Sequence, residues 1–192
     1  MFHLVIFGPP GAGKGTQSKK IAEHYGLVHI STGDIFRNEI SRQTKTGLKA
    51  KSFIDKGRLV PDKVLIDMLE NVLDSNDSAK GFVWDGFPRT IVQAGEFDNL
   101  LARKNNTVSL VLALKVNERE LVRRLVNRSQ LEGRSDDQKE IITQRLKVYK
   151  EATIPIIEFY KKQKKLRFVP GMGSVEMIFS DICGVIDHYI SS

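Results

Sequence analysis

Cysteine is nearly absent from this sequence, and so are long hydrophobic runs. The single Cys183 cannot form a disulfide within the chain, and the four histidines lack metal-ligand spacing, so we expect no structural zinc. The longest apolar run, around residues 110–114, is too short to cross a membrane. Because a glycine-rich loop already begins at Gly8, we expect no signal peptide ahead of it. These absences favour a cytoplasmic protein that has no membrane partner.

Acidic residues are too few to balance the basic ones, and the formal net charge is +7. A basic surface favours an anionic partner, which could be a nucleic acid or a nucleotide. The one dense run of lysines, at residues 161–165, is most simply the solvated end of a helix, where cations complement the helix dipole. Because no aromatic residues alternate with these lysines, we do not expect the run to bind nucleic acid.

The strongest motif is GPPGAGKGT at residues 8–16, which follows the apolar run LVIF at residues 4–7. Such an apolar run is typical of a buried parallel strand. The glycines allow successive backbone N–H groups to point at phosphate oxygens, and Lys14 adds a positive charge near them. A glycine-rich turn that binds nothing is the alternative, but the strand before the motif and the register of Lys14 favour a phosphate loop. Gly15 stands where the general pattern has Ser or Thr, and the hydroxyl follows at Thr16.

Strands and helices alternate along the rest of the chain. Further strands are expected, with helices between them, at residues 27–30, 82–84, 109–116 and 166–169. We also expect a polar loop at residues 129–135, a helix that starts at Asp136, and a break or kink at Pro155. This alternation predicts an α/β fold with a doubly wound, five-stranded parallel sheet and helices on both faces. Ligands of such sheets bind at the carboxyl ends of the strands.

A second motif, DGFPRT at residues 85–90, follows a predicted strand. Asp85 at the strand end is suited to hold Mg²⁺, mostly through water, because this ion keeps much of its hydration shell. Gly86 and Pro88 would turn the backbone so that Arg89 points into the cleft. A tight turn with a surface arginine is the alternative, but the position beside a phosphate loop favours a binding role.

Several arginines form a third signal. Arg124 and Arg128 are four residues apart on a predicted helix, so they share a face and repel each other unless an anion lies between them. Arg134 lies in the polar loop, and Arg145 lies on the next predicted helix. Each would be an ordinary surface charge by itself. Together with the cations of the two motifs around one cleft, they would neutralise several phosphates at once.

No catalytic base is evident, and a reaction with a phosphate acceptor needs none. A phosphate monoester has a second pKa of about 6, so it is already an anion at neutral pH. The barrier is then the repulsion between two polyanions, which arginines and Mg²⁺ relieve. A hydroxyl acceptor would instead call for a carboxylate base.

Together these motifs resemble the adenylate kinases, a family of nucleoside monophosphate kinases, and the likeness runs nearly from end to end. The residues that carry it are GPPGAGKGT at 8–16, STGDIFR at 31–37, GRLVP at 57–61, DGFPRT at 85–90, Gln93, Arg124, Arg128, GRSDD at 133–137, Arg145 and Gly173. The resemblance implies a P-loop NTPase-like fold and the reversible, Mg²⁺-dependent reaction ATP + AMP ⇌ 2 ADP. It also implies a monomer that works on small nucleotides.

The resemblance implies roles for individual residues as well. The catalytic cations would be Lys14, Arg89, Arg124, Arg128, Arg134 and Arg145. ATP would be bound by Gly11, Ala12, Gly13, Lys14, Gly15, Thr16, Arg128 and Gly173. AMP would be bound by Thr32, Arg37, Arg58, Leu59, Val60, Gly86, Phe87, Pro88, Arg89, Gln93, Arg134 and Arg145. Thr32 and Gln93 resemble adenine-reading positions, which favours AMP over pyrimidine nucleotides.

The family pattern also divides the chain into three parts. The core would comprise residues 1–30, 61–127 and 139–192, with a helical flap for the monophosphate at 31–60 and a short lid at 128–138. This lid lacks the long insertion and the four-cysteine metal site of some members. Trp84, where the family more often has an aliphatic residue, is expected to affect packing only.

Two other interpretations stay open at this point. A UMP/CMP kinase shares the loop, the arginines and the fold. A nucleotide-dependent switch or a nucleic-acid binder could use the same loop, although a switch does not need so many phosphate-binding cations around a second site.

Overall fold

A five-stranded parallel sheet forms the centre of the molecule, which the computed structural model describes at residues 1–132 and 134–191. The strands are β1 (Phe2–Phe7), β2 (Val28–Ser31), β3 (Gly81–Asp85), β4 (Leu110–Lys115) and β5 (Leu166–Pro170). They lie in the order β2-β3-β1-β4-β5, and every neighbouring pair is parallel. The predicted α/β fold is confirmed, with the strand before the phosphate loop at the middle of the sheet.

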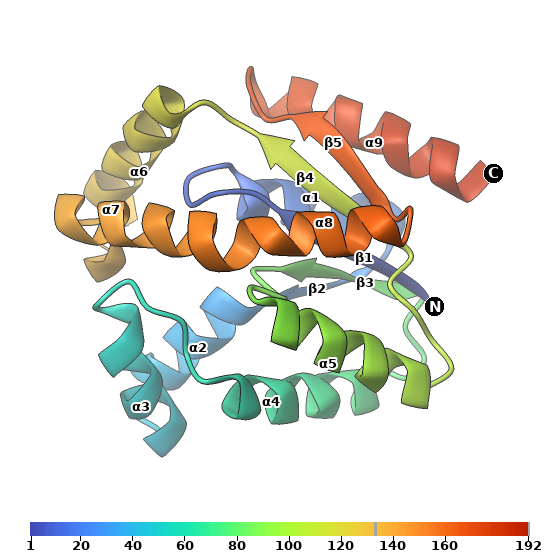
Figure 1. Ribbon diagram of the computed structural model, residues 1–192, viewed down its shortest axis with the longest axis horizontal. Coiled ribbons are helices and arrows are strands. Elements are labelled where there is room, and N and C mark those ends of the chain that lie inside the picture. The colour runs from blue at the N-terminus through green and yellow to red at the C-terminus, as the bar shows by residue number, and fades with distance from the viewer. Residues whose placement is uncertain (133, 192) are drawn as a thin grey trace.

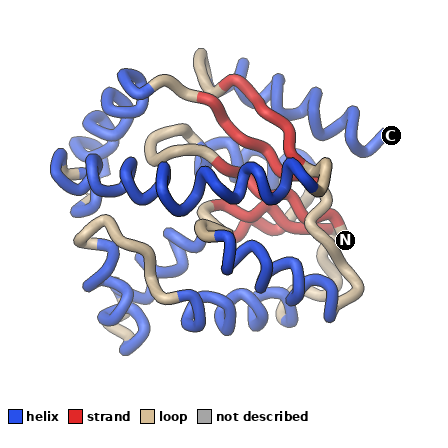
Figure 2. The backbone as a smooth tube through the Cα atoms, in the orientation of Figure 1, coloured by secondary structure: helices blue, strands red, loops and turns tan. Residues whose placement is uncertain are grey.

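Helices cover both faces of this sheet, as Figures 1 and 2 show. Their bounds are α1 (Lys14–Tyr25), α2 (Thr32–Ser41), α3 (Lys45–Ile54), α4 (Asp62–Asp74), α5 (Ile91–Arg103), α6 (Glu118–Glu132), α7 (Lys139–Val148), α8 (Ile154–Lys162) and α9 (Val175–Ser191). One core layer includes Leu69 of α4, Phe97 of α5 and Tyr160 of α8. The layer on the other face includes Ile21 of α1 and Ile182 of α9. None of the helices in the described ranges has the length and apolar character that crossing a membrane requires.

The inner strands are buried on both faces, which explains their continuous apolar sequences. All residues of β3 are buried, and so is β1 from His3 onward. Trp84 of β3 is fully buried, packs edge-on against Phe97, and donates an indole hydrogen bond of 3.2 Å to Nδ1 of His3. Its contacts are therefore with the core of the protein.

Helices α2 and α3 form a hairpin beside the sheet, at the lower left of Figure 1. Ser31 and Thr44 cap the two helices, because each hydroxyl accepts a backbone N–H from the first turn. The helices meet closely at Gly47, where a Cβ atom would lie 2.2 Å from the carbonyl oxygen of Glu39. Only glycine permits this approach, so the hairpin is a compact unit.

Two expectations about helix boundaries are wrong. Helix α6 runs on to Glu132, so residues 129–132 of the predicted polar loop are helical, because the segment SQLE contains neither glycine nor proline. Gly133 of the predicted lid lies outside the described residues. A single 3₁₀ turn, η1 (Ser135–Asp137), precedes α7, so the helix expected from Asp136 begins at Lys139.

The break or kink expected at Pro155 takes the form of a π-helical turn just before it, and the chain stays helical across this point. Helix α7 continues through a π-helical turn, η2 (Tyr149–Thr153), into α8. The N–H group of Ile154 bonds to the carbonyl of Tyr149, five residues earlier. Pro155 then falls in the first turn of α8, where a missing N–H group costs little.

Candidate active site

The loop between β1 and α1 forms a cradle for an anion. Gly11 and Gly13 have positive φ angles of 83° and 87°. A Cβ atom on Gly11 would lie 2.9 Å from the carbonyl oxygen of Leu121, so only glycine fits at this position of the loop. Helix α1 begins at Lys14, and its unpaired first-turn N–H groups together with the helix dipole favour an anion at this point.

Lys14 is folded over the loop. Its ammonium group donates to the carbonyl oxygens of Gly8 at 2.8 Å and Pro9 at 3.0 Å. Burial lowers the pKa of Lys14 to about 8; Asp85 opposes this shift, whereas Arg89 adds to it. Lys14 is therefore a cation among other cations, and an anion on the loop would relieve their repulsion.

Asp85 lies beside the same loop. It ends β3 and is only 9% exposed, and a Cβ atom on Gly15 would lie 3.3 Å from its Oδ2. Nε2 of His29 is 3.9 Å from that oxygen. In the described part of the chain, no group of three or more His, Cys, Asp or Glu side chains is placed to hold a metal. A single carboxylate next to a phosphate loop nevertheless fits Mg²⁺, which usually keeps several waters.

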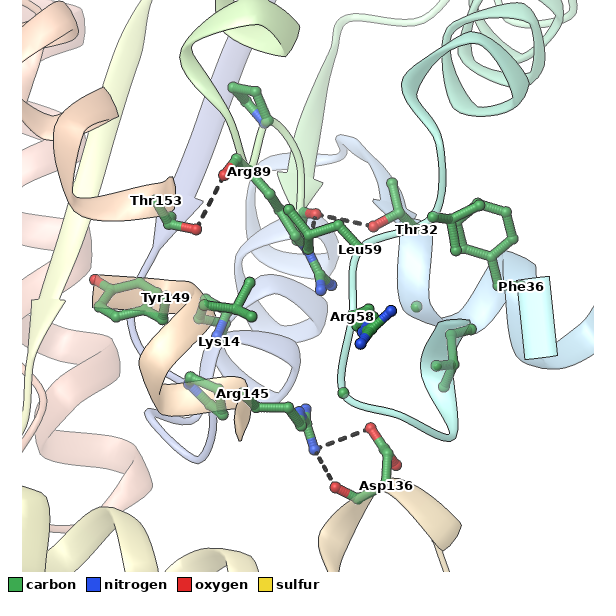
Figure 3. A pocket seen from close by; sticks show the side chains of 18 of the residues that line it. Lys14, Thr32, Phe36, Arg58, Leu59, Arg89, Asp136, Arg145, Tyr149 and Thr153 are labelled. Carbon is green, nitrogen blue, oxygen red and sulfur yellow. Dashed lines mark hydrogen bonds and ion pairs between the residues drawn. The ribbon is translucent and has the colours of Figure 1, made fainter. Parts of the chain in front are cut away.

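A cavity of about 140 Å³ opens at this end of the sheet, between the phosphate loop, the α2–α3 hairpin and α7. Its lining includes five cationic side chains, Lys14, Arg37, Arg58, Arg89 and Arg145. Figure 3 shows Arg58, Arg89 and Arg145 arranged around one space. So many cations in one small cavity repel one another unless anionic groups lie between them.

Arg89 is fixed by hydrogen bonds from several elements. Its Nε donates to the carbonyl of Gly86 at 2.6 Å, and its backbone N–H donates to Oε1 of Gln93 at 2.6 Å. The hydroxyl of Thr153 donates to the Arg89 carbonyl at 3.1 Å, as Figure 3 shows. Burial, with Arg145 nearby, lowers the pKa of Arg89, but a guanidinium stays charged in proteins. The side chain is thus a preorganised cation at the cavity wall.

Carboxylates of the η1 turn hold two further arginines. Nη1 of Arg145 lies 2.9 Å from the carboxylate of Asp136 and 2.6 Å from that of Asp137. Arg128 makes a two-pronged contact with Asp137, at 2.6 and 2.7 Å. A phosphate group has the charge and the oxygen geometry to replace these carboxylates.

Arg124, Arg128 and Arg134 were expected around the same cleft, but they do not line this cavity. Arg124 bonds to Glu120 at 2.7 Å, and Arg134 bonds to Glu132 at 2.6 Å. Arg124 and Arg128 were expected to need an anion between them. In the structure each is instead neutralised by a carboxylate of the protein, Glu120 for Arg124 and Asp137 for Arg128. Arg124 still faces the phosphate loop, since a Cβ atom on Gly13 would lie 3.8 Å from its Nη1.

Most of the residues expected to bind AMP do line the cavity. They are Thr32, Arg37, Arg58, Leu59, Val60, Gly86, Pro88, Arg89, Gln93 and Arg145. Phe87 does not, because its ring is buried in the core and packs edge-on against Phe97. Of the residues expected to bind ATP, Lys14 alone lines this cavity, and Thr16 and Gly173 lie on exposed surface.

Some side chains that shape the site could not be recognised from the sequence. Asp62 accepts a 2.5 Å hydrogen bond from Nε2 of Gln93, although an acidic residue after Pro61 looks like an ordinary helix start. Tyr149 and Thr153 line the cavity from the π-helical turn, which no sequence signal predicted.

A phosphate loop at the carboxyl edge of a parallel sheet, facing a second anion site rich in arginine, defines the class of nucleoside monophosphate kinases. Residues 6–165 match a family model described as adenylate kinase. The chain belongs to the adenylate kinase family.

Close relatives agree with this assignment over nearly their whole length. An adenylate kinase of Bacteroides thetaiotaomicron is 49% identical over 187 residues, which cover 97% of this chain and 99% of the relative. One of Parabacteroides distasonis is 50% identical over 188 residues, covering 98% and 99% of the two chains. One of Flavobacterium psychrophilum is 47% identical over 189 residues, covering 98% and 100%.

Proposed function

We propose that AMP lies in the cavity against Arg89 and that ATP lies along the phosphate loop, so that their phosphates meet near Lys14 and Arg145. As a member of the adenylate kinase family, the chain transfers the terminal phosphoryl group of ATP to AMP and forms two molecules of ADP, reversibly. The observation that supports this arrangement best is the group of five cations in one cavity at the end of the phosphate loop.

Electrostatics does most of the catalytic work in this proposal. The AMP phosphate is an anion at neutral pH and attacks without a general base. Arg89 and Arg145 offset its repulsion from ATP and stabilise the charge that spreads over the transferred group. Gln93 and Thr153 hold the backbone of Arg89, and the Gly86 carbonyl holds its guanidinium, so little reorganisation is needed when substrates arrive.

The η1 carboxylates give a way to hold the arginines until nucleotides bind. Asp136 and Asp137 hold the guanidinium groups of Arg145 and Arg128 in place. Phosphate oxygens that took over these guanidinium groups would set the two aspartates free and draw the lid inward. Closure would then exclude water and prevent simple hydrolysis of ATP.

Asp85 is the residue that we propose to hold Mg²⁺, through water. Bound there, the ion would neutralise part of the phosphate charge. Asp85 itself supplies a fixed, buried carboxylate beside Gly15. Chain segments 1–30, 61–127 and 139–192 would form the core, 31–60 the flap and 128–138 the short lid. A cytoplasmic monomer is the form in which we expect the enzyme to work.

The choice of acceptor is tested with a coupled assay that follows ADP formation from ATP with AMP, UMP or CMP. AMP should be turned over fastest, because the cavity presents the amide of Gln93 to the base. Faster turnover of UMP or CMP would contradict the assignment. Tight, salt-sensitive binding of an oligonucleotide without transferase activity would favour a nucleic-acid binder instead.

A further inference from the structure

The amide of Gln93 is held by hydrogen bonds at both of its ends. Gln93 is only 1% exposed and lines the cavity. Its Nε2 donates to Oδ1 of Asp62 at 2.5 Å, and its Oε1 accepts the backbone N–H of Arg89 at 2.6 Å. The backbone N–H of Gln93 is capped in turn by the Thr90 hydroxyl at 3.1 Å. The side chain therefore has little freedom to turn.

Asp62 and the backbone N–H of Arg89 determine which end of the Gln93 amide is the nitrogen and which is the oxygen. An ionised aspartate can only accept hydrogen bonds, so the atom that faces Asp62 must be the nitrogen. A backbone N–H can only donate, so the atom that faces Arg89 must be the oxygen. A flipped amide would place two acceptors opposite each other at Asp62 and two donors opposite each other at Arg89.

The held amide still has capacity for a ligand. A primary amide carries two hydrogens and two oxygen lone pairs, and one of each is used by Asp62 and Arg89 among the described residues. One N–H and one lone pair remain, and the two partners fix their order along the amide. Adenine matches that order, because its N1 accepts and its 6-amino group donates. A 6-oxopurine has the reverse order, since its N1 carries a hydrogen and its O6 accepts.

We propose that Asp62 is a specificity-determining residue that acts by orienting Gln93, so that the enzyme accepts 6-aminopurine monophosphates and rejects 6-oxopurine monophosphates. Asp62 begins α4, one residue beyond the Pro61 that follows the cavity-lining Leu59 and Val60. Its carboxylate therefore reaches Gln93 from the flap side while Arg89 reaches it from the β3 side. The inference rests on the proposed AMP site and adds a residue that sets its base preference.

The test compares kcat/KM for AMP and for inosine monophosphate in the unmodified enzyme and in Asp62→Asn. The asparagine keeps the shape but can either donate or accept, so it no longer fixes the amide. We expect the AMP-to-inosine-monophosphate ratio to fall by about tenfold, the value of one correctly paired hydrogen bond. Asp74→Asn, at the other end of α4 where Asp74 pairs with Lys104, is the matched control and should keep the ratio.

If Asp62 had a purely structural role, Asp62→Asn would lower kcat/KM for both substrates alike and leave their ratio unchanged. That result would overturn the inference. So would an equal fall of the ratio in Asp74→Asn. Gln93→Ala separates this inference from the proposed site. If Gln93→Ala lowers the ratio and Asp62→Asn does not, the AMP site stands and the role of Asp62 is wrong. If neither changes it, the base does not lie against Gln93 and the proposed site fails too.

Discussion

Asp137 holds Arg128 through two hydrogen bonds of 2.6 and 2.7 Å, and the aspartate side chain is fully buried. The same carboxylate lies 2.6 Å from Nη1 of Arg145. Burial opposes the ionised form, but the Arg128 hydrogen bonds and charge hold the pKa of Asp137 below its ordinary value. One acidic side chain thus ties α6 to α7 at the base of the proposed lid.

Replacing this carboxylate should loosen that connection. Asp137→Asn keeps the shape but leaves Arg128 and Arg145 without a shared anion, so we expect a loss of about 2 kcal/mol in the free energy of unfolding. Urea denaturation measures it. Asp77→Asn, on exposed surface, is the control and should change stability by less than about 0.5 kcal/mol. Equal effects of the two substitutions would contradict the structural role of Asp137.

Lys14 should make ATP binding depend on pH. Because its pKa in the free protein is lowered to about 8, Lys14 loses its charge as the pH rises through that value. Phosphates favour the charged form, so binding above about pH 8 should take up a proton and weaken as the pH rises further. Calorimetry in two buffers with different ionisation enthalpies measures the uptake. Lys14→Met should abolish it, and equal uptake by this variant would show that another group is responsible.

Arg89 should be the most sensitive arginine of the cavity. Arg89→Ala removes a preorganised charge from the transferred phosphoryl group, and we expect kcat to fall by roughly a thousandfold. Arg103→Ala, near the exposed end of α5, should leave kcat unchanged and serves as control. A loss of only tenfold at Arg89 would be too small for a group that stabilises the transition state.

The pair of His3 and Trp84 should make stability fall in mild acid. Burial, assisted by the nearby N-terminus, lowers the pKa of His3 from 6.5 to about 4. Between those values the unfolded chain binds a proton that the folded chain does not, so stability is complete above 6.5 and decreases as the pH falls toward 4. From pH 7 to pH 5 the loss should be about 2 kcal/mol.

His3→Gln keeps an acceptor for the Trp84 indole but does not titrate, so its stability should vary less with pH. Urea denaturation of both proteins across this range gives the comparison. The same experiment on His24→Gln, an exposed position on α1, checks whether losing any histidine has this effect. Parallel curves for the wild type and His3→Gln would rule the explanation out.

Magnesium should be needed for catalysis and not for folding. Removing divalent ions with EDTA should stop turnover without lowering Tm, because the only protein ligand that we propose is Asp85. Asp85→Asn should raise the Mg²⁺ concentration for half-maximal rate by at least about tenfold. A zinc-selective chelator should change neither rate nor Tm. A drop in Tm with that chelator would reveal a structural metal.

The strands and the phosphate loop could be predicted because their signals are local. An apolar run such as LVIF and the spacing of Gly8, Gly13 and Lys14 depend on residues that are neighbours in the sequence. The end of α6 and the helical conformation around Pro155 were less predictable. Both depend on backbone hydrogen bonds, and the residue types at those places allow more than one pattern.

The partners of the charged side chains were the least predictable part of the site. Arginine positions could be read from the sequence, but the carboxylates that hold them depend on tertiary distances. Asp62 is hydrogen-bonded to Gln93, which lies 31 residues away in the sequence, and Thr153 is hydrogen-bonded to Arg89, which lies 64 residues away. Phe87 shows the same limit, because a residue inside a binding motif can turn toward the core instead of the ligand.

The π-helical turn at Tyr149–Thr153 lets one continuous helical segment both line the cavity and pack against the core. An extra residue in a helical turn rotates everything beyond it by about 100°. Upstream of the turn, Arg145 lines the cavity. Downstream of it, Ile156 and Tyr160 are fully buried in the core. Shortening the turn by one residue would restore ordinary helical winding and swing those two side chains toward solvent. The number of residues in this segment therefore couples the orientation of a cavity-lining arginine to the packing of α8 against the core.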